Sequence, residues 1–260
     1  MKIKMFQVDA FTSELFSGNP AAVCLLNEWL SDELMLSIAS ENNLSETAFL
    51  NLSDNPIGIR WFSPLKEVDL CGHATLAASR VLFDHPDYQS RDEIIFESGR
   101  GPLSARMNNE MIFLDFPIDE PHVHEFSESE KLFGYESSAV YCGQDDYLFI
   151  FDDEKLISEI KPNFELVSRL DKRGAIISAR SENYDFVSRC FFPNYGIDED
   201  PVTGSAHTLL TPYWAAELNK TDLIAKQLSK RGGILHLTVN GDRVNIGGRT
   251  SVFFKGEIIL

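Results

Sequence analysis

The chain has 260 residues, of which 43% are hydrophobic, and a formal net charge of −17. This length and hydrophobic content predict a globular protein of one large or two ordinary domains. The acidic balance argues against a nucleic-acid partner, because binding a polyanion needs a basic face, and no cluster of Lys and Arg supplies one. A small carboxylated ligand is still possible, since a few backbone N–H groups can bind it locally.

The sequence gives no sign of export or of a membrane partner. Residues 1–9 alternate like a strand and lack the apolar core of a signal peptide, and the apolar stretch 21–26 is far shorter than the roughly 20 residues that span a bilayer. We therefore expect a cytoplasmic protein. No CxxC or Cys/His pair has metal-ligand spacing, so neither a metal site nor a disulfide framework is predicted from the cysteines. These are Cys24, Cys71, Cys142 and Cys190.

The first half of the chain reads as a mixture of strands and helices. One helix is expected to begin near Ser31, an N-cap candidate, and another near Gly72. The second is apolar nearly all round, which predicts a helix inside the domain. Alternating or β-rich runs predict strands at 3–10, 47–52, 57–62, 93–97 and 111–116.

The second half has the same character after a polar stretch that marks a domain boundary. We predict an N-terminal domain over 1–118 and a C-terminal domain over 119–260, with a final strand at 250–260 that can pair with the first domain. A helix is expected to open near Gly204 and to reach about Glu217. Strands are predicted at 139–142, 147–151, 175–178 and 186–192.

The two halves contain an internal repeat. The segment from Arg60 to Ala77 matches the segment from Arg189 to Thr208: each has a strand, a proline turn, an acidic residue, a Gly-polar-Ala triplet and a helix of small residues. In this alignment Glu67-Val68-Asp69 corresponds to Gly196-Ile197-Asp198, and a three-residue insertion follows before the Gly-polar-Ala triplet. A duplicated domain is the simplest explanation, and ligands often bind between such domains.

Each Gly-polar pair of the repeat stands at an expected helix start. Gly72 and Gly204 allow close backbone approach, and His73 and Ser205 add a side-chain hydrogen bond, so each pair is a candidate anion site at the positive end of a helix. The alternative is that the glycines only allow tight turns and that the polar residues only cap the helices. The occurrence of the pair in both halves favours the functional interpretation.

Two carboxylates are further candidates. Glu46 lies where a polar loop gives way to an apolar strand, an edge at which a partly desolvated carboxyl can take and return a proton. A solvated surface glutamate is the ordinary alternative. Asp200 precedes the second helix and could bind an amine or hydroxyl of a ligand, although a role in the turn alone explains it equally well.

Several enzyme classes lack their motifs. The chain has no P-loop, no GxSxG nucleophile elbow, no HExxH and no Rossmann glycine fingerprint after a strand. No NAD, nucleotide or metal cofactor is therefore predicted.

Three motifs in order give a specific resemblance. They are Ser45-Glu46-Thr47-Ala48-Phe49, Asp69-Leu70-Cys71-Gly72-His73-Ala74-Thr75 and Asp200-Pro201-Val202-Thr203-Gly204-Ser205-Ala206. With these motifs the chain resembles the PhzF-like family of phenazine-biosynthesis isomerases, within the diaminopimelate epimerase-like fold. The resemblance covers almost the whole chain, from the Phe6-Gln7-Val8-Asp9 opening to the closing Gly241-Asp242-Arg243-Val244.

The resemblance implies a fold and a set of site residues. The fold is α+β, with two pseudo-repeated domains, each a mixed curved sheet or barrel around a central helix, an active site between them and usually a homodimer. By similarity, Glu46 is the catalytic acid/base, which works without a cofactor, and His73 and Asp200 assist it. Gly72, Gly204 and Ser205 are implied to bind the substrate.

One departure from the wider superfamily bears on the mechanism. Epimerases of this fold use two cysteines on opposite faces of the substrate, and only Cys71 falls at such a position here. A two-thiol racemase is therefore disfavoured, and Cys71 is expected to be a small buried packing residue. We expect an isomerase that moves a proton within a small carboxylated substrate. A non-catalytic binding protein or an epimerase with two bases are the alternatives.

Overall fold

The computed structural model describes all 260 residues, and these divide into two compact units. Unit 1 consists of Met1–Asp115 and Gly247–Leu260, and unit 2 consists of Phe116–Ile246. The sequence analysis placed the division close by, after residue 118. It counted the last residues with the second domain, but it expected a strand at 250–260 that can pair with the first domain, and β18 does pair with β1. In the structure they belong to unit 1. Each unit is described by itself.

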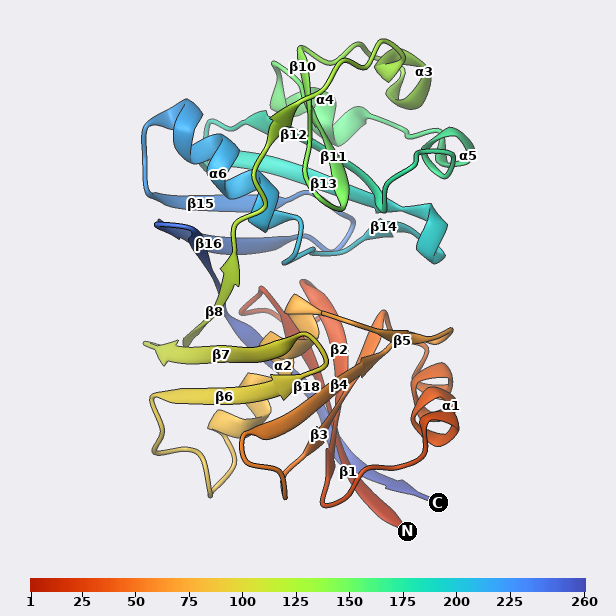
Figure 1. Cartoon of the computed structure of the whole chain (residues 1–260), viewed down its shortest axis with the longest axis vertical. Helices are drawn as coiled ribbons and strands as arrows, with labels where there is room; N and C mark the ends of the chain where they lie inside the picture. The colour runs from red at the N-terminus through yellow and green to blue at the C-terminus, as the bar shows by residue number, and fades with distance from the viewer. The chain divides into compact units, whose positions relative to one another are not determined.

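Unit 1 consists of one curved sheet and two helices that pack against it (Figure 1). In chain order its elements are β1 (Lys2–Ala10), β2 (Asn19–Leu26), α1 (Asp32–Asn42), β3 (Glu46–Asn51), β4 (Ile57–Phe62), β5 (Glu67–Val68), α2 (Gly72–Phe83), β6 (Glu93–Ser98), β7 (Gly101–Asn108), β8 (Met111–Pro117) and β18 (Thr250–Ile259).

The sheet of unit 1 mixes parallel and antiparallel pairs. β18, β1 and β2 pair antiparallel, β2 and β3 are parallel across α1, and β3 and β4 are antiparallel. β4 and β6 are parallel across α2, and β6, β7 and β8 continue antiparallel. The two termini lie side by side at one end of this unit (Figure 1), because the final strand pairs with the first along its length.

Helix α2 is the central helix of unit 1. It packs against β1, β2, β3, β7 and β18, so the sheet curves around it (Figure 1). Eleven of its twelve residues are buried, with Arg80 as the exception. Alanine, serine and threonine side chains along its length let the strands approach closely on several sides. The apolar pattern therefore predicted this helix correctly.

Helix α1 packs on the opposite face of the same strands. The hydroxyl of Ser31 accepts a hydrogen bond from the backbone N–H of Leu34 at 3.3 Å, which confirms the predicted N-cap. Its buried face, with Met35 and Ile38, contacts Phe49 of β3 and the β4 aromatic Phe62. Successive residues of β3 point to opposite faces, so the side of β3 opposite Phe49 is left for α2.

Unit 2 has the same kinds of elements. They are β9 (His122–Val123), α3 (Ser129–Phe133), β10 (Ala139–Cys142), β11 (Asp146–Ile150), α4 (Glu154–Glu159), α5 (Phe164–Val167), β12 (Gly174–Arg180), β13 (Phe186–Phe192), the 3-10 turn η1 (Pro193–Tyr195), β14 (Ile197–Asp200), α6 (His207–Leu218), β15 (Asp222–Gln227), β16 (Gly233–Asn240) and β17 (Arg243–Gly248).

The pairing of unit 2 repeats that of unit 1. β10 and β11 are antiparallel, β11 and β12 are parallel across α4 and α5, and β12 and β13 are antiparallel. β13 and β15 are parallel across α6, and β15 and β16 are antiparallel. The duplication inferred from the sequence is thus present in the order and direction of the strands.

Two arginine–glutamate ion pairs, one in each unit, occupy equivalent positions in the repeat. Arg60 of β4 makes two hydrogen bonds to Glu67, at 2.7 and 2.6 Å, and Arg189 of β13 makes two to Glu199, at 2.6 and 3.0 Å. Glu67 therefore corresponds to Glu199 and not to residue 196, as the sequence alignment had it. The three-residue insertion lies in the turn before this glutamate, and Cys71 then aligns with Thr203.

Helix α6 begins later than predicted. Residues 204–206 form a turn, and the regular helix starts at His207. The reason is visible in the backbone: the N–H groups of His207 and Thr208 bond to the carbonyls three residues earlier, on Gly204 and Ser205, as in a tight 3-10 turn. The Gly-polar pair of unit 2 thus lies in the turn that leads into the helix, whereas Gly72 is the first residue of α2.

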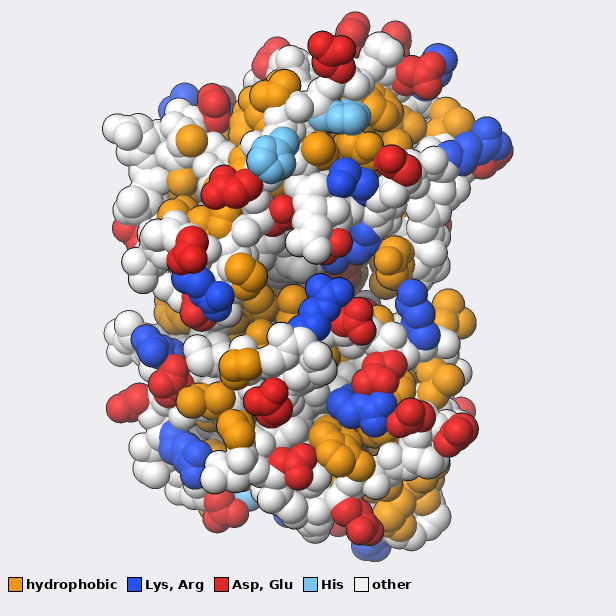
Figure 2. Space-filling model, in the orientation of Figure 1, with side chains coloured by type: hydrophobic (Ala, Val, Ile, Leu, Met, Phe, Trp, Pro, Cys, Tyr) orange, Lys and Arg blue, Asp and Glu red, His pale blue; other side chains and the backbone are white.

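The distribution of charge on the visible surface and the character of the helices agree with the composition of the chain. Figure 2 shows acidic side chains spread over the visible face, with Lys and Arg interspersed among them and no continuous basic area on that face. None of the helices combines the length and the apolar character needed to cross a membrane.

Candidate active-site residues

Glu46 and His73 meet in unit 1. Glu46 is the first residue of β3 and His73 the second of α2, and the imidazole Nε2 lies 3.2 Å from the carboxylate Oε2. The side chain of Glu46 is 13% exposed and that of His73 is 6% exposed. The ordinary alternative of a solvated surface glutamate is therefore wrong for Glu46. An acid/base group needs such partial access together with a fixed direction.

Cys71 completes a group of three. It is the N-cap residue of α2, and its Sγ lies 3.5 Å from Nδ1 and 4.0 Å from Nε2 of His73. Burial, together with the nearby Glu46 carboxylate, raises the pKa of the Cys71 thiol to about 11, so it is neutral near pH 7. The residue is buried as expected, but it contacts a polar ring rather than serving only as apolar packing.

The surroundings favour a charged imidazole at His73. Burial alone would lower its pKa, but the interactions with Cys71 and Glu46 outweigh burial and raise the pKa well above 6.5. The Nε2 of His73 also lies 3.2 Å from the Glu46 carboxylate, within hydrogen-bond distance. His73 thus brings an N–H donor to the carboxylate.

In unit 2, a buried polar network fixes the turn before α6. The Thr203 hydroxyl donates to the Asp200 carboxylate, and the Thr203 N–H donates to Oε1 of Gln227 at 2.8 Å. The Gln227 amide in turn donates to the backbone carbonyl of Asp200 at 2.8 Å. Asp200 is almost fully buried, and these contacts fix both its backbone and its carboxylate.

Ser205 is oriented by a buried ion pair. Arg173 makes two hydrogen bonds to the Asp146 carboxylate and donates from Nη1 to the Ser205 hydroxyl at 3.0 Å. Its guanidinium also lies over the ring of Phe192, 4.7 Å from the centroid. Because the Ser205 oxygen accepts from Arg173, its own proton can be directed to an acceptor such as a carboxylate.

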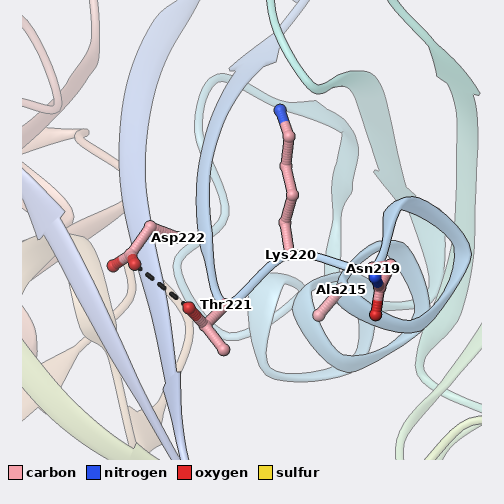
Figure 3. Close-up of a pocket in the computed structure, with 5 residues that line it drawn as sticks. All are labelled: Ala215, Asn219, Lys220, Thr221 and Asp222. Carbon is pink, nitrogen blue, oxygen red and sulfur yellow. Dashed lines mark hydrogen bonds between the residues drawn. The ribbon is translucent and has the colours of Figure 1, made fainter.

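One surface pocket of unit 2 is not part of this arrangement. A pocket of about 630 Å³ lies at the C-terminal end of α6, lined by Ala215, Asn219, Lys220, Thr221 and Asp222 (Figure 3). In Figure 3 the Lys220 side chain extends away from the hydrogen-bonded pair of Thr221 and Asp222. A twelve-residue helix is about 18 Å long, so this pocket is remote from Ser205 at the other end. A second pocket, of about 490 Å³, touches Arg173.

Sequence reasoning missed three of these residues. Arg173 and Asp146 are both far from Ser205 in the chain, and Gln227 lies at the end of a strand that the sequence did not predict. The only available signal was weak: Arg173 stands directly before an apolar run. The spacing of metal ligands along the sequence did not predict that Glu46, Cys71 and His73 would come together, because Glu46 belongs to a different element.

Comparisons with known proteins agree with this fold. The chain is 44% identical to a protein of Halalkalibacterium halodurans named as an uncharacterized isomerase, over 100% of both chains. Its structure matches that of a phenazine biosynthesis PhzF family protein of Enterococcus faecalis with a TM-score of 0.95 and 44% identity, over 100% of both chains. A hydroxyproline epimerase of Agrobacterium vitis shares the fold alone, with a TM-score of 0.62 and 8% identity over 99% of this chain and 92% of that one.

The fold is thus of the α+β, epimerase-like class, with the duplicated architecture that the sequence predicted. The family model for phenazine biosynthesis-like proteins, PhzC-PhzF, matches residues 8–256. The chain belongs to this family.

Proposed function

We propose that the protein is a cofactor-independent isomerase that moves a proton within a small carboxylated substrate. The observation that carries the proposal is the contact between Glu46 and His73, 3.2 Å apart and largely shielded from solvent. The isomerase name of the Halalkalibacterium halodurans relative supports the reaction class.

In the proposed mechanism Glu46 transfers the substrate proton. Its carboxylate takes a proton from one carbon of the substrate, which breaks a C–H bond and leaves the electron pair on the substrate, and then returns the proton to another carbon. The His73 imidazolium offsets the negative charge that develops in between. Gly72, at the N-terminus of the same helix, adds backbone N–H groups that favour an anion.

The role proposed for unit 2 is substrate binding. Ser205, held by Arg173, donates to a substrate oxygen, and Gly204 lets the substrate approach the backbone of the turn. Asp200 assists catalysis by accepting a hydrogen bond from an amine or hydroxyl of the substrate. The guanidinium of Arg173 adds positive charge beside Ser205, which suits a carboxylated ligand in a chain of net negative charge.

The epimerase alternative needs a second titratable group. Thr203 occupies the position in unit 2 that corresponds to Cys71, and its hydroxyl donates to Asp200. A threonine does not titrate in the physiological range, so unit 2 has no thiol at this position, and a two-thiol epimerase is disfavoured.

Exchange with solvent deuterium tests the reaction class. Candidate cyclic carboxylates bearing amino or hydroxyl groups are incubated with the protein in D₂O and followed by NMR. An isomerase incorporates deuterium and shifts a double bond or a proton position. A binding protein leaves the C–H unexchanged, and an epimerase inverts a stereocentre without moving the proton to another carbon.

We also propose that the protein is a homodimer. Unit 1 exposes an aromatic pair in which Phe16 and Phe253 meet edge to face at 5.7 Å, and Phe254, the following residue of β18, is also exposed. Exposed apolar patches of this kind mark interaction surfaces. Light scattering should give twice the chain mass for the native protein and a smaller mass for Phe253→Glu, and a monomeric native protein would refute the proposal.

A further inference from the structure

Three potential metal ligands of different kinds converge in unit 1. The carboxylate of Glu46, the Sγ of Cys71 and an imidazole nitrogen of His73 all lie within 4.8 Å of one another. His73 comes from the first turn of α2, Cys71 is the residue directly before that helix, and Glu46 is the first residue of β3. The start of a helix and the start of a strand therefore set their spacing.

The distances suit a tetrahedral cation. Zinc binds nitrogen and oxygen at about 2.0–2.2 Å and sulfur at about 2.3 Å, so neighbouring ligand atoms lie roughly 3.3–3.6 Å apart. Nε2 of His73 is 3.2 Å from the Glu46 oxygen, within this range to about 0.1 Å. The 4.0 Å between Nε2 and the Cys71 sulfur has to close by about 0.4 Å, and the sulfur and the carboxylate oxygen lie within 4.8 Å of each other, so this pair has to close as well.

The charges also balance. A carboxylate and a thiolate together neutralise a divalent cation in a buried place. On binding, the metal–sulfur bond forms, the S–H bond breaks and the proton leaves to the buffer, as does the proton on Nε2 of His73. Mixed sulfur, nitrogen and oxygen ligands select zinc-like cations over magnesium or calcium, which prefer oxygen alone.

We propose that Glu46, Cys71 and His73 form a binding site for zinc or a similar thiophilic divalent cation, and that the bound cation inhibits the enzyme. The inhibitory part rests on the proposed function, because the cation would occupy the carboxylate oxygen and the imidazole nitrogen that the proton transfer requires. The Glu46 side chain, 13% exposed, is the more accessible of the ion pair, and water is the expected fourth ligand.

Cobalt(II) titration of the full-length protein tests the site directly. Co²⁺ reports a thiolate ligand by a near-ultraviolet charge-transfer band and tetrahedral geometry by strong visible bands. We expect one equivalent to produce both, Zn²⁺ to displace it and Mg²⁺ not to. Cys71→Ser should abolish the charge-transfer band, and Cys142→Ser, the matched control, should keep it. Absence of the bands, or their survival in Cys71→Ser, would overturn the proposal.

Two further variants protect the test against a folding defect. Glu46→Gln and His73→Gln should each weaken Co²⁺ binding at least tenfold while keeping the native circular dichroism spectrum. Unchanged affinity in both would show that the cation binds elsewhere.

The proposed metal site and the proposed function can be refuted independently of each other. The Co²⁺ spectrum needs no substrate, so its presence in a protein without isomerase activity would refute only the proposed function. If the isomerase is active, Zn²⁺ should inhibit it reversibly and a chelator should restore the rate. Cys71→Ser should then need at least tenfold more Zn²⁺ for half-inhibition of its own metal-free rate. Equal sensitivity of the two proteins would refute the inhibitory role.

Discussion

The imidazole of His73 lies 3.2 Å from the carboxylate of Glu46, with both side chains largely shielded from solvent. The pair is formed because the central helix α2 begins next to the start of β3, and because most residues of the first half of that helix are small enough for the strands to approach. The fold thus places this carboxylate–imidazole pair at the end of its most buried helix.

The repeated ion pairs predict an unequal effect on stability. The Arg189–Glu199 pair is more buried than Arg60–Glu67, with glutamates exposed 23% and 42%, and Arg189 also donates to two backbone carbonyls. Glu199→Gln should therefore lower the free energy of unfolding by about 3 kcal/mol. Glu67→Gln, its matched control, should cost about 1 kcal/mol. Urea unfolding measures both, and equal losses would contradict the burial argument.

Gln227 should be a structural support of the turn that carries Asp200 and Ser205. Gln227→Leu leaves the Thr203 N–H and the Asp200 carbonyl without this partner, which should cost about 2–4 kcal/mol. The exposed Gln89→Leu is the control and should change the free energy of unfolding by less than about 0.5 kcal/mol. A similar small loss for both variants would show that the amide is dispensable.

The burial of His207 leads us to predict that the free energy of unfolding decreases in acid. Burial lowers its pKa to about 4, partly offset by the hydrogen bond to the Thr203 carbonyl, and its Nε2 has no partner. Between about pH 6.5 and 4 the unfolded chain binds a proton that folded His207 does not, so stability falls by about 1.4 kcal/mol per pH unit as the pH decreases. The raised pKa of His73 acts in the other direction and only above about pH 6.5.

The variant His207→Leu isolates this contribution. It should be less stable than the native protein at pH 7 but should lose less stability between pH 6.5 and 4, so the two curves converge. Denaturant unfolding across this range measures the slopes. Parallel curves for the two proteins would show that His207 does not titrate as its burial implies.

Arg173 should act on substrate binding through Ser205. Arg173→Lys keeps a cation beside Asp146 but cannot also reach the Ser205 hydroxyl with a planar fork. We expect KM to rise about tenfold, roughly 1.4 kcal/mol, with kcat changed less than threefold. In a Ser205→Ala background the same substitution should have little further effect on KM. Independent, additive effects would contradict a role through Ser205.

The sequence predicted the architecture well where one physical signal dominates. Alternation located β1, β4 and β13, and the small-residue pattern located α2. It missed β2, which is buried on both faces and reads as a continuous apolar run, and β7, whose composition is polar. An apolar run without alternation cannot be separated from a buried helix by periodicity alone.

The candidate site was predictable only in part. The position of Glu46 in the chain resembles that of an ordinary loop carboxylate, and its burial depends on the first turn of α2, which no local pattern reveals. Arg173 and Gln227 reach the turn before α6 from elements distant in sequence. Contacts of this kind are set by the pairing of strands, so a single sequence shows the residues but not their neighbours.

Deuterium incorporation into a substrate by the variant Glu46→Gln is the most direct test of the proposed mechanism. Glutamine keeps the size and a hydrogen-bonding group but cannot carry the transferred proton. With a substrate that the native protein labels in D₂O, the variant should lose deuterium incorporation by a factor of about 10²–10⁴ while still binding the ligand. Glu41→Gln, an exposed glutamate on α1, is the control and should label at the native rate. Native-rate labelling by Glu46→Gln would contradict the assignment of Glu46 as the acid/base.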